Sequence, residues 1–174
     1  GTGVGPNHFL VNENGRLVNR AKELGVDNPL GRGRMPLWVD YDRDGWLDLL
    51  LLHLNAERRD REPSKNLLFK QQEGSFEDVT ATTGMAIAQQ FAFLTDLTGD
   101  QIVDLASANF RQVYDLSVVP FRDIANTFTS IGQVQDVATA DFNGESRSDI
   151  FLARTNWTND SADVVQPLPD VVAA

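Results

Sequence analysis

Short apolar segments alternate along the chain with clusters of acids and turn-forming residues. The clearest case is the stretch of residues 40–48, which lies between the apolar residues 37–39 and 49–52. Apolar segments of this length, bounded by turn formers, are typical of β-strands. The pattern therefore predicts two strands joined by an acidic turn.

The nine residues of this turn carry Asp40, Asp42, Asp44 and Asp48 at positions 1, 3, 5 and 9, with glycine at position 6. Four carboxylates brought to one point repel one another unless a cation lies among them. A loop with oxygen ligands and no histidine or cysteine favours calcium over zinc or copper, and magnesium retains more of its waters. An EF-hand would have an acid at position 12, where Leu51 stands, so the loop is expected to close at position 9. The alternative is an acidic turn that is solvated and binds no metal.

Weaker copies of the loop follow at residues 96–104 and 141–149. In the second loop Gln101 occupies the position of the turn glycine, so we expect a shifted turn or a positive φ there, a backbone angle that glycine tolerates better than glutamine. Judged by charge count and turn geometry, the first loop is expected to bind most tightly, the second next and the third least. Up to three calcium ions are predicted, with these candidate ligands: Asp40, Asp42, Asp44, Trp46 and Asp48; Asp96, Thr98, Asp100, Ile102 and Asp104; Asp141, Asn143, Glu145, Arg147 and Asp149.

A β-hairpin signal alternates with these loops. Residues 7–11 are followed by the turn Asn14-Gly15, and residues 66–70 by the turn Glu73-Gly74. A two-residue turn of this kind between apolar segments predicts a hairpin. Residues 114–124 carry a degraded copy of the pattern, without the turn glycine.

Each acidic loop, together with the hairpin after it, supplies four strands at a repeat of about 40 to 60 residues, as a propeller blade requires. The predicted fold is all-β, a single partial β-propeller domain over residues 1–174 with about three partial blades. Because so few blades cannot close a ring, further blades from the same or another chain are expected. The end of one blade, two blades, an incomplete blade and a tail are expected at residues 1–34, 35–84, 85–130, 131–168 and 169–174.

The same reasoning predicts the inner strands and the core of the blades. The inner strands are expected at residues 37–40, 91–96 and 134–141. The core residues are expected to be Leu37, Val39, Leu49, Leu51, Leu68, Phe76, Val79, Phe93, Leu105, Ala108, Val137, Ile150 and Leu152.

The loops follow the pattern D-x-[DNT]-x-[DE]-x-x-x-D-[LI], and the hairpins between them follow N-x-[FL]-[LF] and G-x-[FL]-x-[DN]. This arrangement resembles the FG-GAP and VCBS-type repeats of calcium-binding propellers, most closely the bacterial relatives of cartilage acidic protein, over most of the chain up to about Arg154. The resemblance implies a propeller, commonly seven-bladed, with calcium between the first two strands of several blades and a location outside the cytoplasm. Gln101 and Glu145 depart from the pattern, since the family usually has glycine and aspartate there.

The net charge of −10 is largely explained by the loops, which contain ten of the 25 acids. An acidic balance argues against nucleic acid as a partner, because phosphate binding needs clustered Lys and Arg. The chain has no cysteine, which excludes disulfides and cysteine metal sites. No apolar run approaches the roughly 18 residues of a membrane span. Loops that need calcium at about 10⁻⁴ to 10⁻³ M fit an extracellular, cell-surface or periplasmic location.

Catalytic signals are weak in this sequence. His8 and His53 belong to strand-like segments and have no nucleophile at a known motif spacing, so surface or structural histidines are expected. Nearly every pair of acids is better explained as calcium ligands than as glycosidase carboxylates. The predicted function is a non-catalytic calcium-binding module, a scaffold or adhesion domain for a protein or glycan partner. The alternative is the propeller domain of a carbohydrate-active lyase or hydrolase, because fold alone does not fix function.

Overall fold

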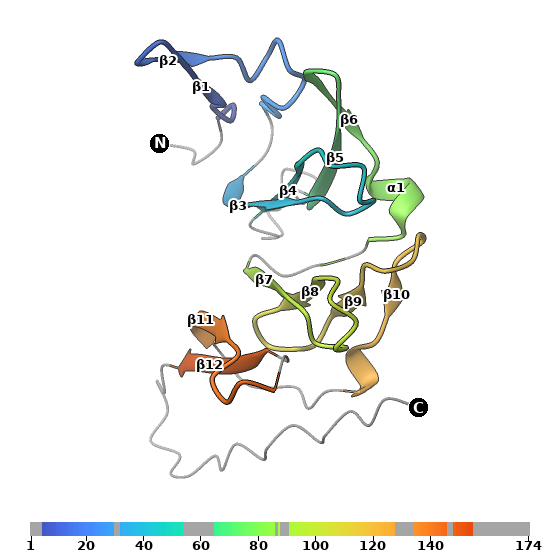
Figure 1. Ribbon diagram of the computed structural model, residues 1–174. Helices are drawn as coiled ribbons and strands as arrows, with labels where there is room; N and C mark the ends of the chain where they lie inside the picture. The colour runs from blue at the N-terminus through green and yellow to red at the C-terminus, as the bar shows by residue number, and fades with distance from the viewer. Residues whose placement is uncertain are drawn as a thin grey trace, which may run out of the picture. The chain divides into compact units, whose positions relative to one another are not determined.

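The chain is an all-β protein that divides into two compact units, Gly1–Phe91 and Ala92–Ala174. Every strand pair in the sheets of both units is antiparallel (Figure 1). The predicted tail lies outside the residues that the structure describes. The computed structural model describes residues 5–29, 32–53, 65–85, 87, 91–127, 134–145 and 148–154.

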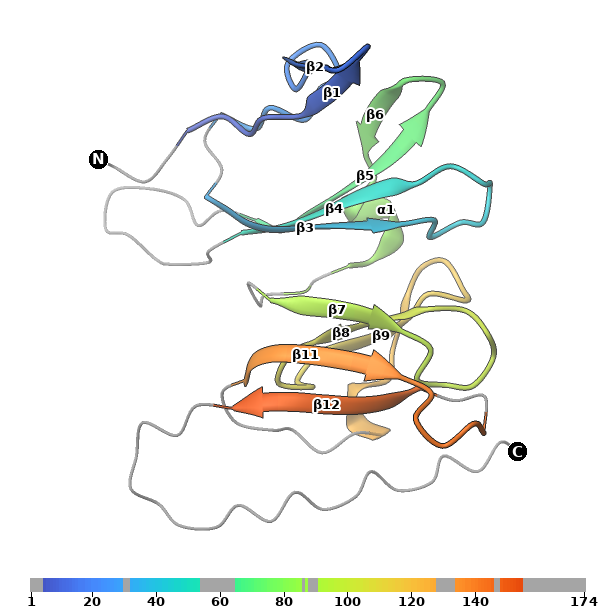
Figure 2. The same cartoon turned by 60° about the vertical axis from the view of Figure 1, so that its left-hand side comes forward.

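The first unit contains a hairpin and a four-stranded sheet with strands in sequence order (Figure 2). The hairpin consists of β1 (Leu10–Glu13) and β2 (Arg16–Asn19). The sheet consists of β3 (Gly33–Val39), β4 (Asp48–His53), β5 (Leu67–Gln72) and β6 (Ser75–Asp78). A single helical turn that the pattern did not predict, α1 (Thr80–Thr83), follows β6 and ends at Gly84 in the left-handed conformation.

The second unit repeats the four-stranded arrangement and adds a separate strand pair. No helix in the described part of either unit is long and apolar enough to cross a membrane. The sheet consists of β7 (Ala92–Thr95), β8 (Asp104–Ser107), β9 (Val113–Asp115) and β10 (Arg122–Asp123), and is followed by the short helix η1 (Ala125–Thr127). The additional pair consists of β11 (Val134–Ala140) and β12 (Asp149–Arg154).

The two predicted hairpin turns are confirmed. Asn14 and Gly15 have φ of 52° and 88°, and Glu73 and Gly74 have φ of 45° and 91°. Positive φ at both central residues is the turn geometry that matches the twist of paired strands, which explains the glycine in each turn. The weaker hairpin around residues 114–124 is also confirmed as a strand pair, β9 with β10.

The predicted core is confirmed in part. Six of its members are buried: Val39, Leu49, Leu51, Leu68, Phe93 and Leu105. The prediction was wrong in degree for the other seven, which are only half-buried: Leu37, Phe76, Val79, Ala108, Val137, Ile150 and Leu152. Leu37 lies on the edge strand β3, and Val137, Ile150 and Leu152 lie on the two-stranded β11–β12 sheet, where they pack from one side against the cluster around Phe93 and Phe110.

Strand β4 is buried on both faces, whereas the predicted core included only Leu49 and Leu51 of its apolar run. Leu50 and Leu52, on the face opposite Leu49 and Leu51, are 1% and 0% exposed. A continuous apolar run is typical of a strand covered on both sides. Leu49 and Leu51 belong to a core cluster with Ala21, Val26 and Phe69.

His53, at the end of β4, is fully buried rather than on the surface. Its amide donates to the side-chain oxygen of Asn66 at 2.6 Å, and the Asn66 amide group donates to the carbonyl of Ile87 at 2.7 Å. The imidazole Nε2 lies 3.1 Å from the side-chain nitrogen, Nδ2, of Asn28. Burial lowers the pKa of His53 below its ordinary value of 6.5, so the fold favours the neutral ring.

We expect the first unit to lose stability as the pH falls below about 6.5. In this range His53 binds a proton in the unfolded chain but stays neutral in the folded protein, so protonation favours unfolding. The loss is at most ~1.4 kcal/mol per pH unit, the slope for one proton. Denaturant unfolding between pH 7.5 and pH 5 measures it, with His53→Gln, which cannot titrate, showing a shallower decline. His8→Gln is the matched control, because His8 is exposed; an equal decline in all three proteins would contradict the prediction.

Candidate calcium loops

The first loop, residues 40–48, is closed by hydrogen bonds from backbone amides to its first and last aspartates. Val39 pairs with Asp48 at the point where β3 and β4 meet. One Asp48 oxygen accepts from the Tyr41 amide at 3.2 Å and the other from the Gln71 amide on β5 at 2.9 Å. The last position of the loop therefore joins the turn to the neighbouring strand.

Asp40 organises the middle of the same turn. Its two oxygens accept from the amides of Asp44 and Gly45, each at 3.1 Å. Asp44 in turn accepts from the Trp46 amide at 2.9 Å. The side chain of Trp46 has no oxygen, so only its main-chain carbonyl could bind a hard cation.

Three of the four predicted acids of this loop lie close together. One carboxylate oxygen each from Asp40, Asp42 and Asp48 lies within 4.8 Å of the other two. Asp48 is fully buried, and burial raises the pKa of its carboxyl group while the two amide hydrogen bonds oppose that rise. No residue in the described ranges donates a hydrogen bond to the buried Oδ1 of Asp42. A buried oxygen without a donor, beside two further carboxylates, fits a hard divalent cation.

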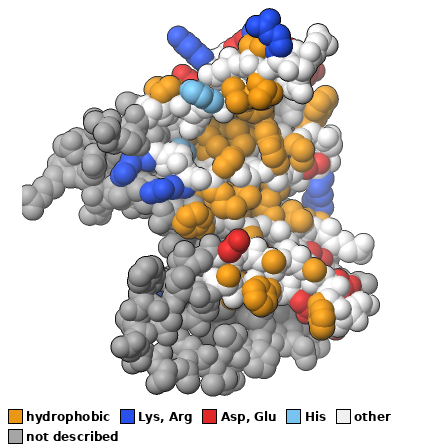
Figure 3. Space-filling view, turned by 90° about the vertical axis from the view of Figure 1, so that its left-hand side faces the viewer, with side chains coloured by type: hydrophobic (Ala, Val, Ile, Leu, Met, Phe, Trp, Pro, Cys, Tyr) orange, Lys and Arg blue, Asp and Glu red, His pale blue; other side chains and the backbone are white. Residues whose placement is uncertain are grey.

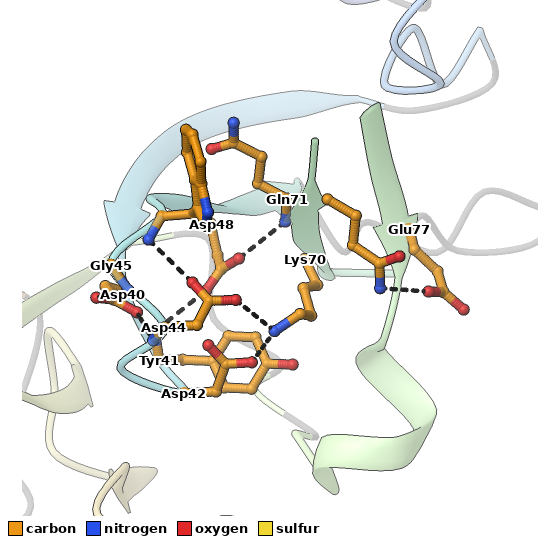
Figure 4. A network of polar contacts seen from close by, with 11 residues as sticks. Asp40, Tyr41, Asp42, Asp44, Gly45, Asp48, Lys70, Gln71 and Glu77 are labelled. Carbon is orange, nitrogen blue, oxygen red and sulfur yellow. Dashed lines mark hydrogen bonds and ion pairs between the residues drawn. The ribbon is translucent and has the colours of Figure 1, made fainter. Parts of the chain in front are cut away.

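Sequence reasoning missed Lys70 on β5. Its Nζ lies 2.7 Å from Oδ2 of Asp44 and pairs even more closely with Oδ2 of Asp42 (Figure 4). The hydrogen bonds to Asp42 and Asp44 raise the pKa of the lysine, which stays charged. The positive charge of Lys70 partly offsets the negative charge of the acids in the loop. In the sequence, a single lysine directly after Leu67, Leu68 and Phe69 could have indicated an ion pair. Its acidic partners could not be identified, because they depend on the pairing of β5 with β4.

The second loop, residues 96–104, uses the same hydrogen-bond pattern. Oδ2 of Asp104 accepts from the amides of Leu97 and Thr98 at 2.8 Å and 3.0 Å. The two oxygens of Asp96 accept from the amides of Gly99 and Gln101 at 2.7 Å and 2.8 Å. Asp100 likewise accepts from the amide of Ile102 at 2.9 Å, as Asp44 does from Trp46 in the first loop.

The expected positive φ at Gln101 is confirmed. Its φ is 68°, and Gly99, two residues earlier, has φ of 81°. The corresponding fourth and sixth residues of the first loop, Arg43 and Gly45, have φ of 60° and 90°. Both positions are therefore left-handed in each loop, and in the second loop glycine occupies the fourth position in place of the sixth.

The second loop also contains buried oxygens without a donor. Asp104 is 1% exposed, and among the described residues neither its Oδ1 nor the hydroxyl of Thr98 has a hydrogen-bond partner. Burial raises the pKa of Asp104 to about 6. The oxygens fit a hard cation. However, within the described ranges only the first loop brings three acids within 4.8 Å of one another, so Asp96, Asp100 and Asp104 are less closely gathered.

The third loop, residues 141–149, keeps part of the pattern at the surface. Asp149 accepts from the Phe142 amide at 2.8 Å, and Asp141 accepts from the amide of Gly144 at 2.7 Å. The side-chain oxygen of Asn143 accepts from the Glu145 amide at 3.1 Å, so a ligand candidate already has a donor within the loop. Arg147 lies outside the described residues. The loop is more exposed than the other two, and it is the weakest of the three candidates.

In chelator, we expect the second unit to lose stability as the pH rises from about 4 to about 6. The folded state holds the Asp104 proton up to about pH 6, whereas the unfolded chain releases it near 3.8, so the stabilisation present at low pH is lost through this window. The slope is at most ~1.4 kcal/mol per pH unit.

Thermal unfolding across this window measures the loss, and Asp104→Asn, which cannot titrate, should remove it. Asp123→Asn, at an exposed acid of the same unit, is the matched control. Calcium should also abolish the loss, because bound metal stabilises the ionised carboxylate. A slope that persists in Asp104→Asn would assign it to another group.

A scan against protein-family models and a search of curated proteins both find no match to this chain.

Proposed function

We propose that the chain is a calcium-stabilised, non-catalytic module of the β-propeller type, acting as a scaffold or binding domain for a protein or glycan partner. The observation that carries this proposal is the arrangement shared by the three loops. In each, the last aspartate accepts from the amide that follows the first aspartate, at 3.2, 2.8 and 2.8 Å. The arrangement fixes carboxylates at the start and the end of the turn, where a calcium loop needs them.

The sheets support the propeller part of the proposal. Each four-stranded antiparallel sheet has an acidic loop between its first two strands, and β11 and β12 flank the third loop in the same way. The pairs Val39↔Asp48, Thr95↔Asp104 and Ala140↔Asp149 close the three loops at the same register. Repetition of a four-stranded antiparallel sheet is the organisation of a β-propeller, in which each sheet is one blade.

Calcium would supply charge neutralisation in this module. The three loops contain ten acids of a chain with net charge −10, and two of the closing aspartates, Asp48 and Asp104, are buried. Burying a carboxylate without a positive partner is unfavourable, so metal binding and folding are coupled. Free calcium is abundant outside the cytoplasm, and we place the module at the cell surface, in the periplasm or in the extracellular space.

An aromatic groove on the first unit is the candidate contact surface for a partner or a further blade. The Phe9 ring stands edge-on to Trp38 at 5.8 Å and is tilted against Phe76 at the same distance. Trp38 is 47% exposed, and Figure 3 shows hydrophobic side chains gathered on this unit. Exposed aromatic rings that line a groove are typical of interaction sites. The groove is lined by Phe9, Leu24, Trp38, Leu47, Gln71, Gly74 and Phe76.

Calcium is expected to raise the thermal midpoint of the protein, by an amount equivalent to ~2.7 kcal/mol when its concentration is a hundredfold above Kd. Asp40→Asn should reduce both the calorimetric heat of calcium binding and this stabilisation of the first unit, because it removes a charge from the loop. Asp27→Asn, outside the loops of the same unit, is the matched control. A wild-type protein that neither binds calcium nor gains stability from it would refute the proposed function.

A further inference from the structure

Lys70 contacts the two carboxylates at positions 3 and 5 of the first loop. Its Nζ bonds to Oδ2 of Asp42 and to Oδ2 of Asp44, and Figure 4 shows the side chain reaching from β5 toward the turn. Only 21% of the lysine side chain is exposed, and its Nζ also lies 5.9 Å from the centre of the Tyr41 ring. The ammonium is therefore held in a defined place, rather than pairing loosely at the surface.

In the second unit, the strand position that corresponds to Lys70 carries a negative charge. β5 pairs with β4 through Phe69↔Leu49, and β9 pairs with β8 through Tyr114↔Leu105. The residue after Phe69 is Lys70, and the residue after Tyr114 is Asp115, which is 1% exposed and paired with Arg122. The contact of a lysine with the acidic loop is therefore specific to the first unit, although both units share the same strand pairing.

We propose that Lys70 is a built-in counter-ion that competes with calcium for the first loop, an inference that rests on the proposed calcium function. The ammonium occupies Oδ2 of Asp42 and Oδ2 of Asp44, beside the buried Oδ1 of Asp42 that has no donor among the described residues, and two cations on the same carboxylates repel each other. A calcium ion at Oδ1 of Asp42 would be repelled by Nζ, and it could also use the two Oδ2 atoms only by displacing the lysine. The lysine therefore lowers the calcium affinity of this loop and stabilises its turn when calcium is scarce.

Terbium luminescence can measure the first loop separately. Terbium is a calcium-like ion whose emission is sensitised by a nearby indole, and Trp46 is the only tryptophan among the residues of the three loops. Excitation of tryptophan, followed by displacement of terbium with calcium, gives the affinity of this loop for both ions. Trp46→Phe should abolish the signal, which assigns it to the loop.

The decisive variant is Lys70→Met, which keeps the length of the side chain and removes its charge. We expect it to lower the terbium and calcium concentrations at half-saturation by about tenfold or more, the order expected for removing a like charge next to a divalent ion. In chelator it should lower the thermal midpoint, because Asp42 and Asp44 lose their partner. Lys22→Met, at an exposed lysine of the same unit, should change neither quantity.

The outcomes separate this inference from the proposed function. Wild-type protein that binds calcium at the first loop, with Lys70→Met binding equally or more weakly, would overturn the role of the lysine and leave the calcium function standing. The absence of any calcium-displaceable signal in wild type and variant alike would overturn both. Should Lys70→Met fail to fold, Lys70→Gln decides the question, since its amide can still donate to the carboxylates without carrying charge.

Discussion

The hydrogen bond from a backbone amide to the last aspartate of each acidic loop is the interaction on which the surrounding structure depends. In the first two loops this aspartate is buried at the point where two strands of a sheet meet. A buried carboxylate tolerates this environment only with donors or a cation close by. The turn must therefore direct its amides inward, and the required backbone angles restrict which residues can occupy its fourth and sixth positions.

The two units satisfy this constraint to different extents. In the first, both oxygens of Asp48 accept amide hydrogen bonds, and Lys70 balances the two acids at positions 3 and 5. In the second, one oxygen of Asp104 accepts two amides and the other has no donor among the described residues. Burial of Asp104 raises the pKa of its carboxyl group to about 6. The cation that we propose would therefore balance more unpaired charge in the second loop than in the first.

Much of the local structure could be predicted from the sequence, because it is determined by residues close together in the chain. Strand pairs joined by acidic turns, the Asn14-Gly15 turn and the left-handed Gln101 all follow from short patterns and the steric freedom of glycine. The contact of Lys70 with the first loop could not be derived in this way. The contact depends on which strand lies next to β4 and at which register, and that information is distributed over residues far apart in the sequence.

The comparison of β5 with β9 shows why a loop motif alone is an incomplete description of a candidate metal site. The two loops share their closing hydrogen bonds and their backbone angles, but the neighbouring strand presents Lys70 to one and carries Asp115 at the matching register of the other. A change of charge on an adjacent strand alters the field at the carboxylates without altering the fold of the turn. Under the proposed function, response to calcium can therefore diverge between loops whose sequences stay alike, because the residues that set it lie outside the loop.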